Sequence, residues 1–508
     1  MRRTFSTYGA KMRQANREAV ATVVALAVIV AVWLVGGIGL AGCGIEVFST
    51  PLWIIGGTIG PWIAAIVCAV ALARCVFADF NLDDDAEVVA GAATAGATDA
   101  EGEEARRGSA ARASLASLIP LILFLLVALA ASIVVRRRAD AAGGGFVNSY
   151  FIGNRALGGF VLAMTTIATY GSVSSFVGGP GQAWQIGFGW VYMAVVQVTA
   201  LVLLYGIFGK KMALISRKLD AVTVVDVIRA RYGSNALANL SALVIVLFFA
   251  ATMVAQFVGG AKLFEAVTGY SYLVGLALFG VAVILFTTIG GFRGVAVTDA
   301  LCGIMMLVGI VVLAGGILTA GGGYEAIMTS IKETSPEMLE PFAGGAMPPS
   351  LYFTQWLLVG VFTFVLPQSV VRTMGYKDVK SLHRAMIWGT VIIGAMMIGV
   401  TSLGVLTAGV LTEDLAAYGG GVDNIIPRAI AQTLPSWAAG VAIIGPIAAS
   451  ISTVSSLLIA SSSAIIKDVY LHWCDDRGHA PSQRSVALSS QAVTLAVGLL
   501  VFVLSIVP

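Results

Sequence analysis

The chain has 508 residues, of which 58% are hydrophobic and only 11% are charged. A soluble globular protein carries about 25% charged residues, so the composition excludes an ordinary soluble enzyme and indicates a polytopic membrane protein. The formal net charge of +3 is too small to favour nucleic acid binding. The apolar runs are continuous and span about 20 residues, whereas a β-barrel shows alternating segments of about 10 residues, so we predict an all-helical protein.

Two apolar runs open the chain, and a charged segment follows them. The runs predict spanning helices near residues 19–41 and 52–76, in a hairpin domain of residues 1–77. Residues 78–113 contain an acidic cluster, an Ala/Gly/Thr run and a second charged cluster. This composition predicts a disordered linker. The remaining residues, 114–508, form one large membrane region.

Ten more spans are predicted in the large region, which gives about twelve for the whole chain. They lie near residues 114–135, 157–178, 183–209, 238–266, 271–290, 296–320, 350–374, 382–410, 436–466 and 485–507. Basic residues, Arg372 among them, gather in alternate loops, so the positive-inside rule places Arg136–Arg138 in the cytoplasm and the last residue outside. The same count of spans puts the basic residues 1–18 outside, against that rule, so the sequence alone leaves the orientation of the first two helices open.

The fourth predicted span is rich in hydroxyl groups for a helix in lipid. It carries a series of Thr and Ser residues from Thr165 to Ser175 and ends in Gly178-Gly179-Pro180-Gly181. This composition at mid-membrane predicts a broken helix, whose freed carbonyl groups can bind a cation where they line a cavity in the protein. The alternative is that the hydroxyl groups bond back to their own helix or to a neighbouring helix.

The eleventh predicted span carries a second set of hydroxyl groups. Ser452 and Thr453 are adjacent, and the carbonyl group of Ala449 lies one turn earlier, so three oxygens can converge on one small ion. Neither hydroxyl-rich span contains Asp or Glu, whereas Ca²⁺ and Mg²⁺ sites and proton-coupled carriers use carboxylates. This difference favours Na⁺ as the bound ion.

Proton coupling is a weaker alternative. It would need a carboxylate in the membrane, and Asp299 and Glu265 lie near predicted helix ends. For Asp299 we expect an anchor at a helix N-terminus, facing water.

Several motifs of residues 114–508 give the chain a family resemblance. These motifs are YFIGNRALGG, SSFVGGPG, FGKK, QFVGGAKL, TTIGGFRGVAVTD, GYKDVKSLHR and AIIKDVYL. Through them the sequence resembles the sodium:solute symporter family. The resemblance implies the leucine-transporter-like fold, in which two inverted five-helix repeats hold a substrate site between them at the middle of the membrane.

The resemblance also implies an ion site. The family's sodium ligands correspond to the carbonyl groups of Ala168, Gly171 and Ala449 and to the hydroxyl groups of Ser452 and Thr453. Na⁺ is then the coupling ion, and no other cofactor is expected.

As the substrate, the resemblance implies pantothenate, imported with Na⁺ across the bacterial cytoplasmic (inner) membrane by alternating access. Tyr170, Ser172 and Ser175 are expected to line its site, with Trp356 and Gln368 opposite them. For Trp356, simple helix packing or anchoring at the membrane interface is the alternative. Hydroxyl and amide donors, together with a half-helix N-terminus, can hold the pantothenate carboxylate without an arginine in the membrane. Enzyme activity is not expected, because the sequence has no P-loop, metal motif or soluble catalytic domain.

The chain departs from the family at three places. Gln368 stands where the family has His after Leu-Pro, and Cys302 stands where it usually has Gln. The second repeat is one helix short at Pro508, so we expect a separately encoded C-terminal segment or an incomplete carrier. A carrier-fold sensor is a further alternative, which would need an output domain. The first two helices resemble a small two-helix bacterial membrane protein of unknown function, so the chain is expected to be a fusion in which this hairpin serves assembly or stability.

Overall fold

The computed structural model describes residues 7–82, 115–141, 146–413, 421–478 and 481–507, and almost all of them are helical. The exception is a small antiparallel pair of strands, β1 (Glu46–Val47) and β2 (Thr50–Pro51), in which Glu46 lies opposite Pro51. Residues 83–113 of the predicted linker lie outside the described residues. The all-helical fold predicted from the apolar runs is confirmed.

The helices are long enough to cross a membrane many times. Within the described residues, nine helices pass the criteria of length and composition, and a tenth candidate is a bent pair, Gly159–Tyr170 and Ser174–Ile186. The nine are Tyr8–Gly39, Leu52–Val76, Ala116–Arg137, Phe188–Leu219, Asn235–Thr268, Tyr272–Ala320, Val379–Ala408, Ser436–Asp476 and Gln483–Leu504. A shorter apolar helix covers Pro349–Val365.

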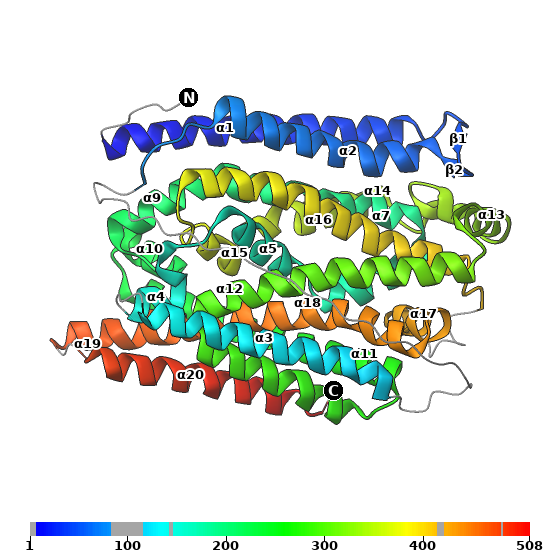
Figure 1. Cartoon of the computed structure of the whole chain (residues 1–508). Helices are drawn as coiled ribbons and strands as arrows, with labels where there is room; N and C mark the ends of the chain where they lie inside the picture. The colour runs from blue at the N-terminus through cyan, green and yellow to red at the C-terminus, as the bar shows by residue number, and fades with distance from the viewer. Residues whose placement is uncertain (1–6, 83–114, 142–145, 414–420, 479–480, 508) are drawn as a thin grey trace.

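The α-helices are numbered in chain order, and Figure 1 labels most of them. They are α1 (Tyr8–Leu34), α2 (Leu52–Ala71), α3 (Leu115–Ala141), α4 (Phe146–Ile152), α5 (Gly159–Tyr170), α6 (Gly179–Ile186), α7 (Phe188–Ala194), α8 (Val198–Leu203), α9 (Lys210–Leu219), α10 (Val224–Tyr232), α11 (Asn235–Thr268), α12 (Tyr272–Ala320), α13 (Tyr324–Thr334), α14 (Pro349–Gln355), α15 (Pro367–Arg372), α16 (Val379–Ala408), α17 (Ile425–Thr433), α18 (Ser436–Ser463), α19 (His472–Asp476) and α20 (Gln483–Leu504). The π-helical segments are η1 (Val35–Gly39), η2 (Leu72–Val76), η4 (Ser174–Gly178), η6 (Leu204–Gly209), η9 (Trp356–Val361) and η13 (Ala464–Leu471). The 3₁₀ segments are η3 (Gly153–Arg155), η5 (Val195–Gln197), η7 (Pro336–Leu339), η8 (Ala343–Gly345), η10 (Phe362–Val365) and η12 (Val422–Asn424).

α12 is 49 residues long, but it reverses direction at Gly291. Gly291 has φ 57° and ψ −162°, a conformation that is open essentially only to glycine. On the first arm, the Thr288 carbonyl oxygen and the Thr494 hydroxyl of α20 both contact the Tyr150 hydroxyl. On the second arm, Gly316 packs against Leu434. The two arms therefore correspond to the two spans predicted at 271–290 and 296–320.

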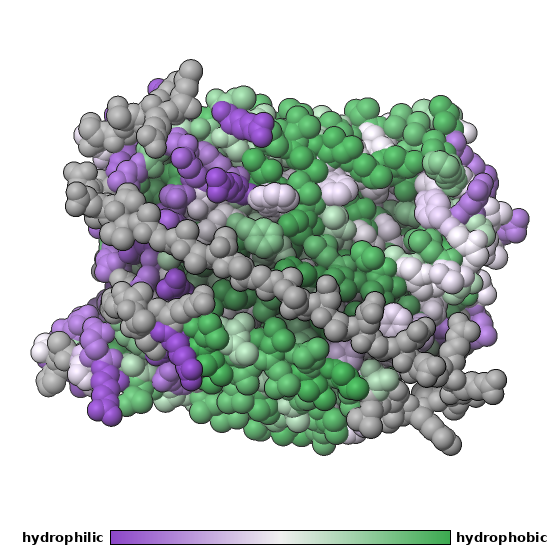
Figure 2. Space-filling view, in the orientation of Figure 1, coloured by the Kyte–Doolittle hydropathy of each residue, from purple (hydrophilic) through white to green (hydrophobic). Residues whose placement is uncertain are grey.

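The helices run side by side, so the bundle has two ends (Figure 1). We call the end with Arg136, Lys210 and Arg217 the basic end, and the end with β1–β2, α13 and η12 the acidic end. The hairpin of α1 and α2 covers one side, beside α7, α9 and α16 (Figure 1). Figure 2 shows hydrophobic side chains over the middle of the bundle and hydrophilic side chains at its ends, as expected of a membrane protein.

The orientation of the hairpin, which the sequence left open, is settled by its contacts. At the basic end, the ammonium group of Lys218 lies over the ring of Tyr8, which is at the start of α1. The ammonium nitrogen is 4.3 Å from the centroid of the Tyr8 ring. The count of three spans before Arg136, which put residues 1–18 at the other end, is therefore wrong for the described hairpin. The reason is physical, because the basic start of α1 follows the positive-inside rule and lies with the other basic residues.

α18 lies at the centre of the bundle. The whole of its spanning window is buried inside the protein, and it packs against α12, α11, α3 and α5. Since this helix carries the second hydroxyl-rich set, its polar groups meet other helices rather than lipid.

Candidate ion and substrate site

The helix with the first hydroxyl cluster is broken. α5 ends at Tyr170, Gly171 has an extended backbone (φ −66°, ψ 125°), and the helix resumes at Ser174. The two halves meet at 70°. The break leaves the carbonyl groups of Ala168 and Gly171 outside the regular helical pattern, and both accept hydrogen bonds from hydroxyl groups of α18 instead.

The five sequence-predicted ion ligands lie together. The Ser452 hydroxyl donates to the carbonyl oxygens of Ala168 at 2.8 Å and Ala449 at 3.1 Å. The Thr453 hydroxyl donates to the carbonyl oxygens of Gly171 at 3.0 Å and Ala449 at 2.9 Å. Hydrogen bonds therefore link three carbonyl and two hydroxyl oxygens where the broken helix meets α18. A hydroxyl group that donates here can also turn a lone pair towards a cation, since it rotates about its Cβ–O bond.

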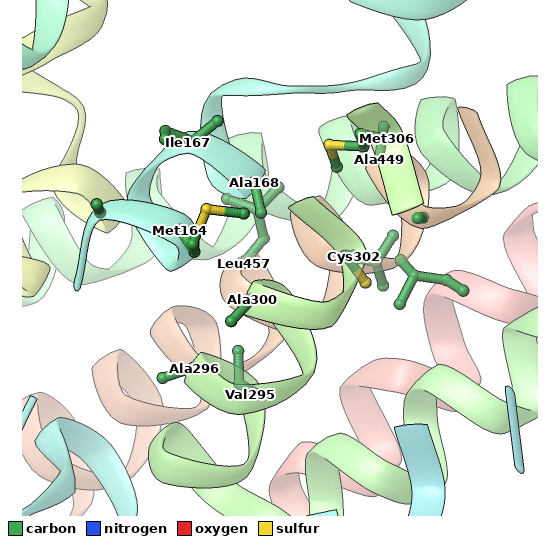
Figure 3. Close-up of a cluster of buried hydrophobic side chains, with 14 of the residues drawn as sticks. Met164, Ile167, Ala168, Val295, Ala296, Ala300, Cys302, Met306, Ala449 and Leu457 are labelled. Carbon is green, nitrogen blue, oxygen red and sulfur yellow. The ribbon is translucent and has the colours of Figure 1, made fainter. Parts of the chain in front are cut away.

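The surroundings of this oxygen cluster are dry. Ala168 and Ser452 are fully buried, and Thr453 is 6% exposed. Figure 3 shows the apolar groups around Ala168 and Ala449, with Met306 and Cys302 of α12 among them. Cys302, one of the departures from the family, is thus part of this hydrophobic packing. In such an environment an ion exchanges its water for protein oxygens, and the electrostatic interactions are stronger than in water.

Gln256 of α11 holds the break from a third side. Its side-chain oxygen accepts a hydrogen bond from the backbone NH of Val173 at 2.9 Å, and its carbonyl oxygen accepts one from the Ser450 hydroxyl at 2.9 Å. Gln256 is 5% exposed. The residue positions the unwound segment relative to α18. The sequence signal for it was the QFVGGAKL motif, but a single amide in an apolar helix does not indicate which backbone group it caps.

A buried ion pair lies next to the oxygen cluster, and sequence reasoning missed it. Arg372 of α15 and Asp299 of α12 are 3.0 Å apart, and their side chains are 2% and 1% exposed. The expectation that Asp299 faces water at a helix N-terminus is wrong, because Gly291 lets α12 reverse and carries Asp299 into the bundle. The assignment of Arg372 to a cytoplasmic loop is also wrong, because α15 packs against α5 and α18 and the Arg372 side chain is buried.

Hydroxyl groups of two helices complete this ion pair. Thr165 of α5 donates to Asp299 at 2.7 Å, and Arg372 donates to Ser456 of α18 at 2.6 Å. Ser455 also donates to Asp299, at 3.3 Å. A buried charge pair is stable only when such partners satisfy its remaining donors and acceptors. The pair adds no net charge, so the nearby oxygen cluster stays suited to a monovalent cation.

The second carboxylate considered from the sequence lies elsewhere. Glu265 is near the end of α11 and accepts a hydrogen bond from the backbone NH of Tyr272 at 3.2 Å. It has no contact with the oxygen cluster. Among the described residues there is also no group of three or more His, Cys, Asp or Glu side chains that could hold a metal ion.

A cavity of about 320 Å³ lies on the acidic side of the break. It reaches Val422 and Asp423 of η12, and it is lined by hydroxyl and amide side chains together with apolar ones. The hydroxyl, amide and carboxylate residues of the lining are Ser174, Ser175, Gln182, Gln197, Gln355, Thr401 and Asp423. Its volume lies within the range of about 300–1,000 Å³ for small-molecule sites.

The three predicted residues of the broken helix differ in their surroundings. Ser175 lines the cavity, and its hydroxyl lies 3.3 Å from that of Ser172. The Tyr170 hydroxyl faces Thr363 and Ser369 without a hydrogen bond of standard geometry.

The two candidates from the opposite helix lie away from the cavity. The Trp356 ring packs on Trp33 of the hairpin, with centroids 5.7 Å apart, so the packing alternative describes it. Gln368 lines a separate cavity of about 10 Å³ beside Arg372 and Ser456, enough for about one water. Its side-chain oxygen is buried without a hydrogen-bond partner. Gln182, Gln197 and Gln355 line the larger cavity.

Comparison with known proteins adds an independent line of evidence. Residues 150–508 match the sodium:solute symporter family, and residues 14–86 match a family described only as a protein of unknown function (DUF997). The chain is 37% identical over 394 residues to the sodium/pantothenate symporter of Haemophilus influenzae, which covers 77% of this chain and 79% of that protein. It is 38% identical over 384 residues to the sodium/pantothenate symporter of Escherichia coli, with 75% and 78% covered.

More distant matches agree with these. The sodium/proline symporter of Escherichia coli is 28% identical over 372 residues, with 71% of this chain and 72% of that protein covered. A solved structure of a Na⁺-coupled sialic acid symporter, in a substrate-bound outward-open state, superposes with a TM-score of 0.69 at 20% identity. The superposition covers 78% of this chain and 82% of that one, and it supports the fold.

Proposed function

The chain belongs to the sodium:solute symporter family, and on that premise we propose that it imports pantothenate together with Na⁺ across the bacterial cytoplasmic membrane. The relatives are transporters rather than enzymes, and Na⁺ is the coupling ion. The observation that carries the proposal is the convergence of Ala168, Gly171, Ala449, Ser452 and Thr453 at the break in α5.

Na⁺ would bind to these five uncharged oxygens. The carbonyl groups of Ala168 and Gly171 belong to the break, whereas Ser452 and Thr453 belong to α18. An ion held by both elements stabilises the arrangement in which they are close together, and only that arrangement gains the binding free energy. Ion binding is therefore linked to the position of the broken helix relative to α18.

Pantothenate would bind in the cavity next to the break. The molecule offers one carboxylate, an amide and hydroxyl groups, and the cavity offers the amides of Gln197 and Gln355 and the hydroxyl of Ser175. Since Ser175 and Gly171 lie on one short segment, Na⁺ that orders this segment also orders the substrate site.

Transport then follows from the alternation between two orientations of the helices around the site. With Na⁺ and pantothenate bound, the half of the bundle that contains the break rocks against the half that contains α18, and the site opens towards the basic end. Release of Na⁺ into the low-sodium cytoplasm removes the stabilisation and lets the carrier return.

Uptake of labelled pantothenate into cells that lack their own carrier tests this proposal. We expect uptake that requires an inward Na⁺ gradient and that unlabelled pantothenate abolishes, while an imposed proton gradient does not replace Na⁺. Uptake driven by a proton gradient without Na⁺ would contradict the assignment of the ion. Unlabelled pantothenate should also be compared with a panel of other small carboxylates as a competitor. If pantothenate were the weakest competitor, the assignment of pantothenate as the substrate would be contradicted.

A separately encoded C-terminal segment, which the family resemblance led us to expect, belongs to the same proposal. Purification of the tagged chain from its native membrane, followed by mass spectrometry, would identify such a segment. Full uptake by the chain alone in a foreign host would show that the segment is not needed.

A further inference from the structure

The hairpin and the carrier share a buried polar contact at the basic end. Glu18 of α1 and Lys210 of α9 form an ion pair of 2.6 Å, with side chains 2% and 3% exposed. Lys210 also donates to the carbonyl oxygen of Ala78 at 2.7 Å, and its ammonium group lies 4.9 Å from the Phe77 ring centroid and 5.2 Å from that of Phe80. All polar partners of this ammonium group among the described residues thus come from the hairpin.

The Glu18 carboxylate is equally well satisfied. It accepts hydrogen bonds from the backbone NH of Ala78 and the side chain of Gln14, both at 2.9 Å. An isolated lysine or glutamate at this depth would be costly in a membrane. Lys210 is part of the carrier, and the hairpin supplies the carboxylate that pairs with it.

Further along the hairpin, three tryptophans reach backbone oxygens of the carrier. Trp33 donates to the carbonyl of Tyr192 at 2.9 Å, and the Tyr192 hydroxyl donates back to the carbonyl of Trp33 at 2.6 Å. Trp53 donates to Leu339, and Trp62 donates to Thr390 of α16 at 3.1 Å. The indole of Trp62 lies over Gly394, where an added Cβ would come within 2.1 Å of its nitrogen. This fit is typical of a specific docking surface rather than of incidental contact between helices in lipid.

The chain connection does not explain this position. Phe77 and Ala78 lie beside Lys210 at the basic end, whereas Ser117 of α3 packs against Gly440 near the start of α18, at the acidic end. The sequence between Leu82 and Leu115 contains two clusters of charged residues.

We propose that residues 7–82 are a docking subunit: a two-helix unit that inserts by itself with both ends at the basic end, and binds the face of the carrier formed by α7–α9 and α16 through the Glu18–Lys210 pair. This assigns a role to a region whose family has no described function. The inference depends on the packing of described residues and not on the identity of the transported solute.

The test uses the full chain with a protease site introduced between residues 83 and 114 and an affinity tag at the C-terminus. After cleavage in detergent, we expect the hairpin to stay bound to the tagged carrier. Glu18→Lys should release most of it, with retention lower by on the order of tenfold or more, because two ammonium groups would then be buried together. Glu18→Gln, which keeps the size of the side chain and an acceptor oxygen for the Ala78 NH, should weaken retention less than Glu18→Lys.

The chain offers a matched control. Glu46 and Lys332 also join the hairpin to the carrier, at 2.6 Å, but their side chains are 39% and 50% exposed. Glu46→Lys should leave retention unchanged, since exposed ion pairs contribute little. Release of the hairpin from the unsubstituted protein after cleavage would overturn the proposal, and so would equal retention in Glu18→Lys. If Glu18→Lys is not produced, Glu18→Gln decides: reduced retention supports the pair, and retention equal to that of the unsubstituted protein overturns it.

Discussion

The hydroxyl group of Ser452 donates a hydrogen bond to the carbonyl oxygen of Ala168 at 2.8 Å, across 284 residues of sequence. The contact joins the central helix α18 to the break in α5, and both atoms are buried. A small ion that needs oxygens from two elements finds them here without any charged ligand. The coupling of ion binding to the shape of the broken helix rests on this contact and on its neighbour between Thr453 and Gly171.

Loss of either α18 hydroxyl should weaken Na⁺ binding. We expect Ser452→Ala and Thr453→Ala each to raise the Na⁺ concentration for half-maximal uptake by about tenfold or more, since each removes one ligand from a dry site. Ser462→Ala is the control, because the Ser462 hydroxyl bonds only to Leu458 of its own helix. An unchanged Na⁺ dependence in both site variants would refute the ion site.

Breaking the buried ion pair should damage the carrier more than breaking an exposed one. Asp299→Asn leaves the Arg372 guanidinium uncompensated inside the bundle, which costs about 3–5 kcal/mol. We expect a lower yield of folded protein and loss of uptake. Asp220→Asn breaks the pair with Arg155, in which Asp220 is 73% exposed, and should have little effect. Thermal unfolding in detergent measures both variants, and equal midpoints would contradict this account.

The cavity residues should affect the substrate rather than the ion. Gln197→Leu and Ser175→Ala should each raise the KM for pantothenate by about threefold to tenfold, because each removes a hydrogen-bonding group from the cavity. The Na⁺ dependence should change less. Trp356→Phe is the control, since its ring packs on Trp33, and it should leave the KM close to that of the unsubstituted protein. A larger effect of Trp356→Phe than of Gln197→Leu would place the substrate elsewhere.

The reversal of α12 should depend on a single glycine. In Gly291→Ala the new Cβ would lie 2.7 Å from the Tyr150 ring and 3.0 Å from its carbonyl oxygen, in a backbone conformation that alanine avoids. We expect a loss of folded protein in fluorescence-detected size-exclusion chromatography. Gly315→Ala on the second arm meets no atom within 4 Å and should be produced normally. Normal behaviour of both variants would show that the reversal does not need glycine.

Thiol labelling can establish the orientation of the hairpin. Cys43 is exposed next to β1, at the acidic end, while Cys302 and Cys474 are buried. In a variant that keeps Cys43 as its one cysteine, a membrane-impermeant maleimide should label intact cells. Labelling that occurs only after the cells are opened would place the basic start of α1 outside and contradict the described packing.

The features that could be predicted from the sequence are those with a local signature. Continuous apolar runs predict helices, and hydroxyl groups followed by Gly-Gly-Pro-Gly predict the break, because both are properties of one segment. The adjacent Ser452 and Thr453 are also a property of one segment, and both their hydroxyl groups and the family resemblance predict an ion site there.

The features that were missed depend on relations between segments. Asp299 looks like a helix-end residue until the reversal at Gly291 is known, and Arg372 looks like a loop residue because lysines follow it. The amides of Gln197 and Gln355 come from different helices, so their shared cavity has no sequence pattern. The orientation of the hairpin could not be found by counting spans, since the count assumes that every connection joins neighbouring ends.

The complete burial of α18 also bears on how the protein is made. Its hydroxyl-rich middle gains little from hydrocarbon, whereas α5, α11 and α12 offer it partners for Ser450, Ser452 and Ser455. These three helices leave the ribosome earlier, so they can pack together and form the polar binding site for α18 before α18 is inserted. We therefore expect the biogenesis of the carrier to be most sensitive to defects at this late step. Loss of one of the polar groups that contact α18 should lower the amount of carrier in the cell before any change in the affinity for the ion or the substrate can be measured.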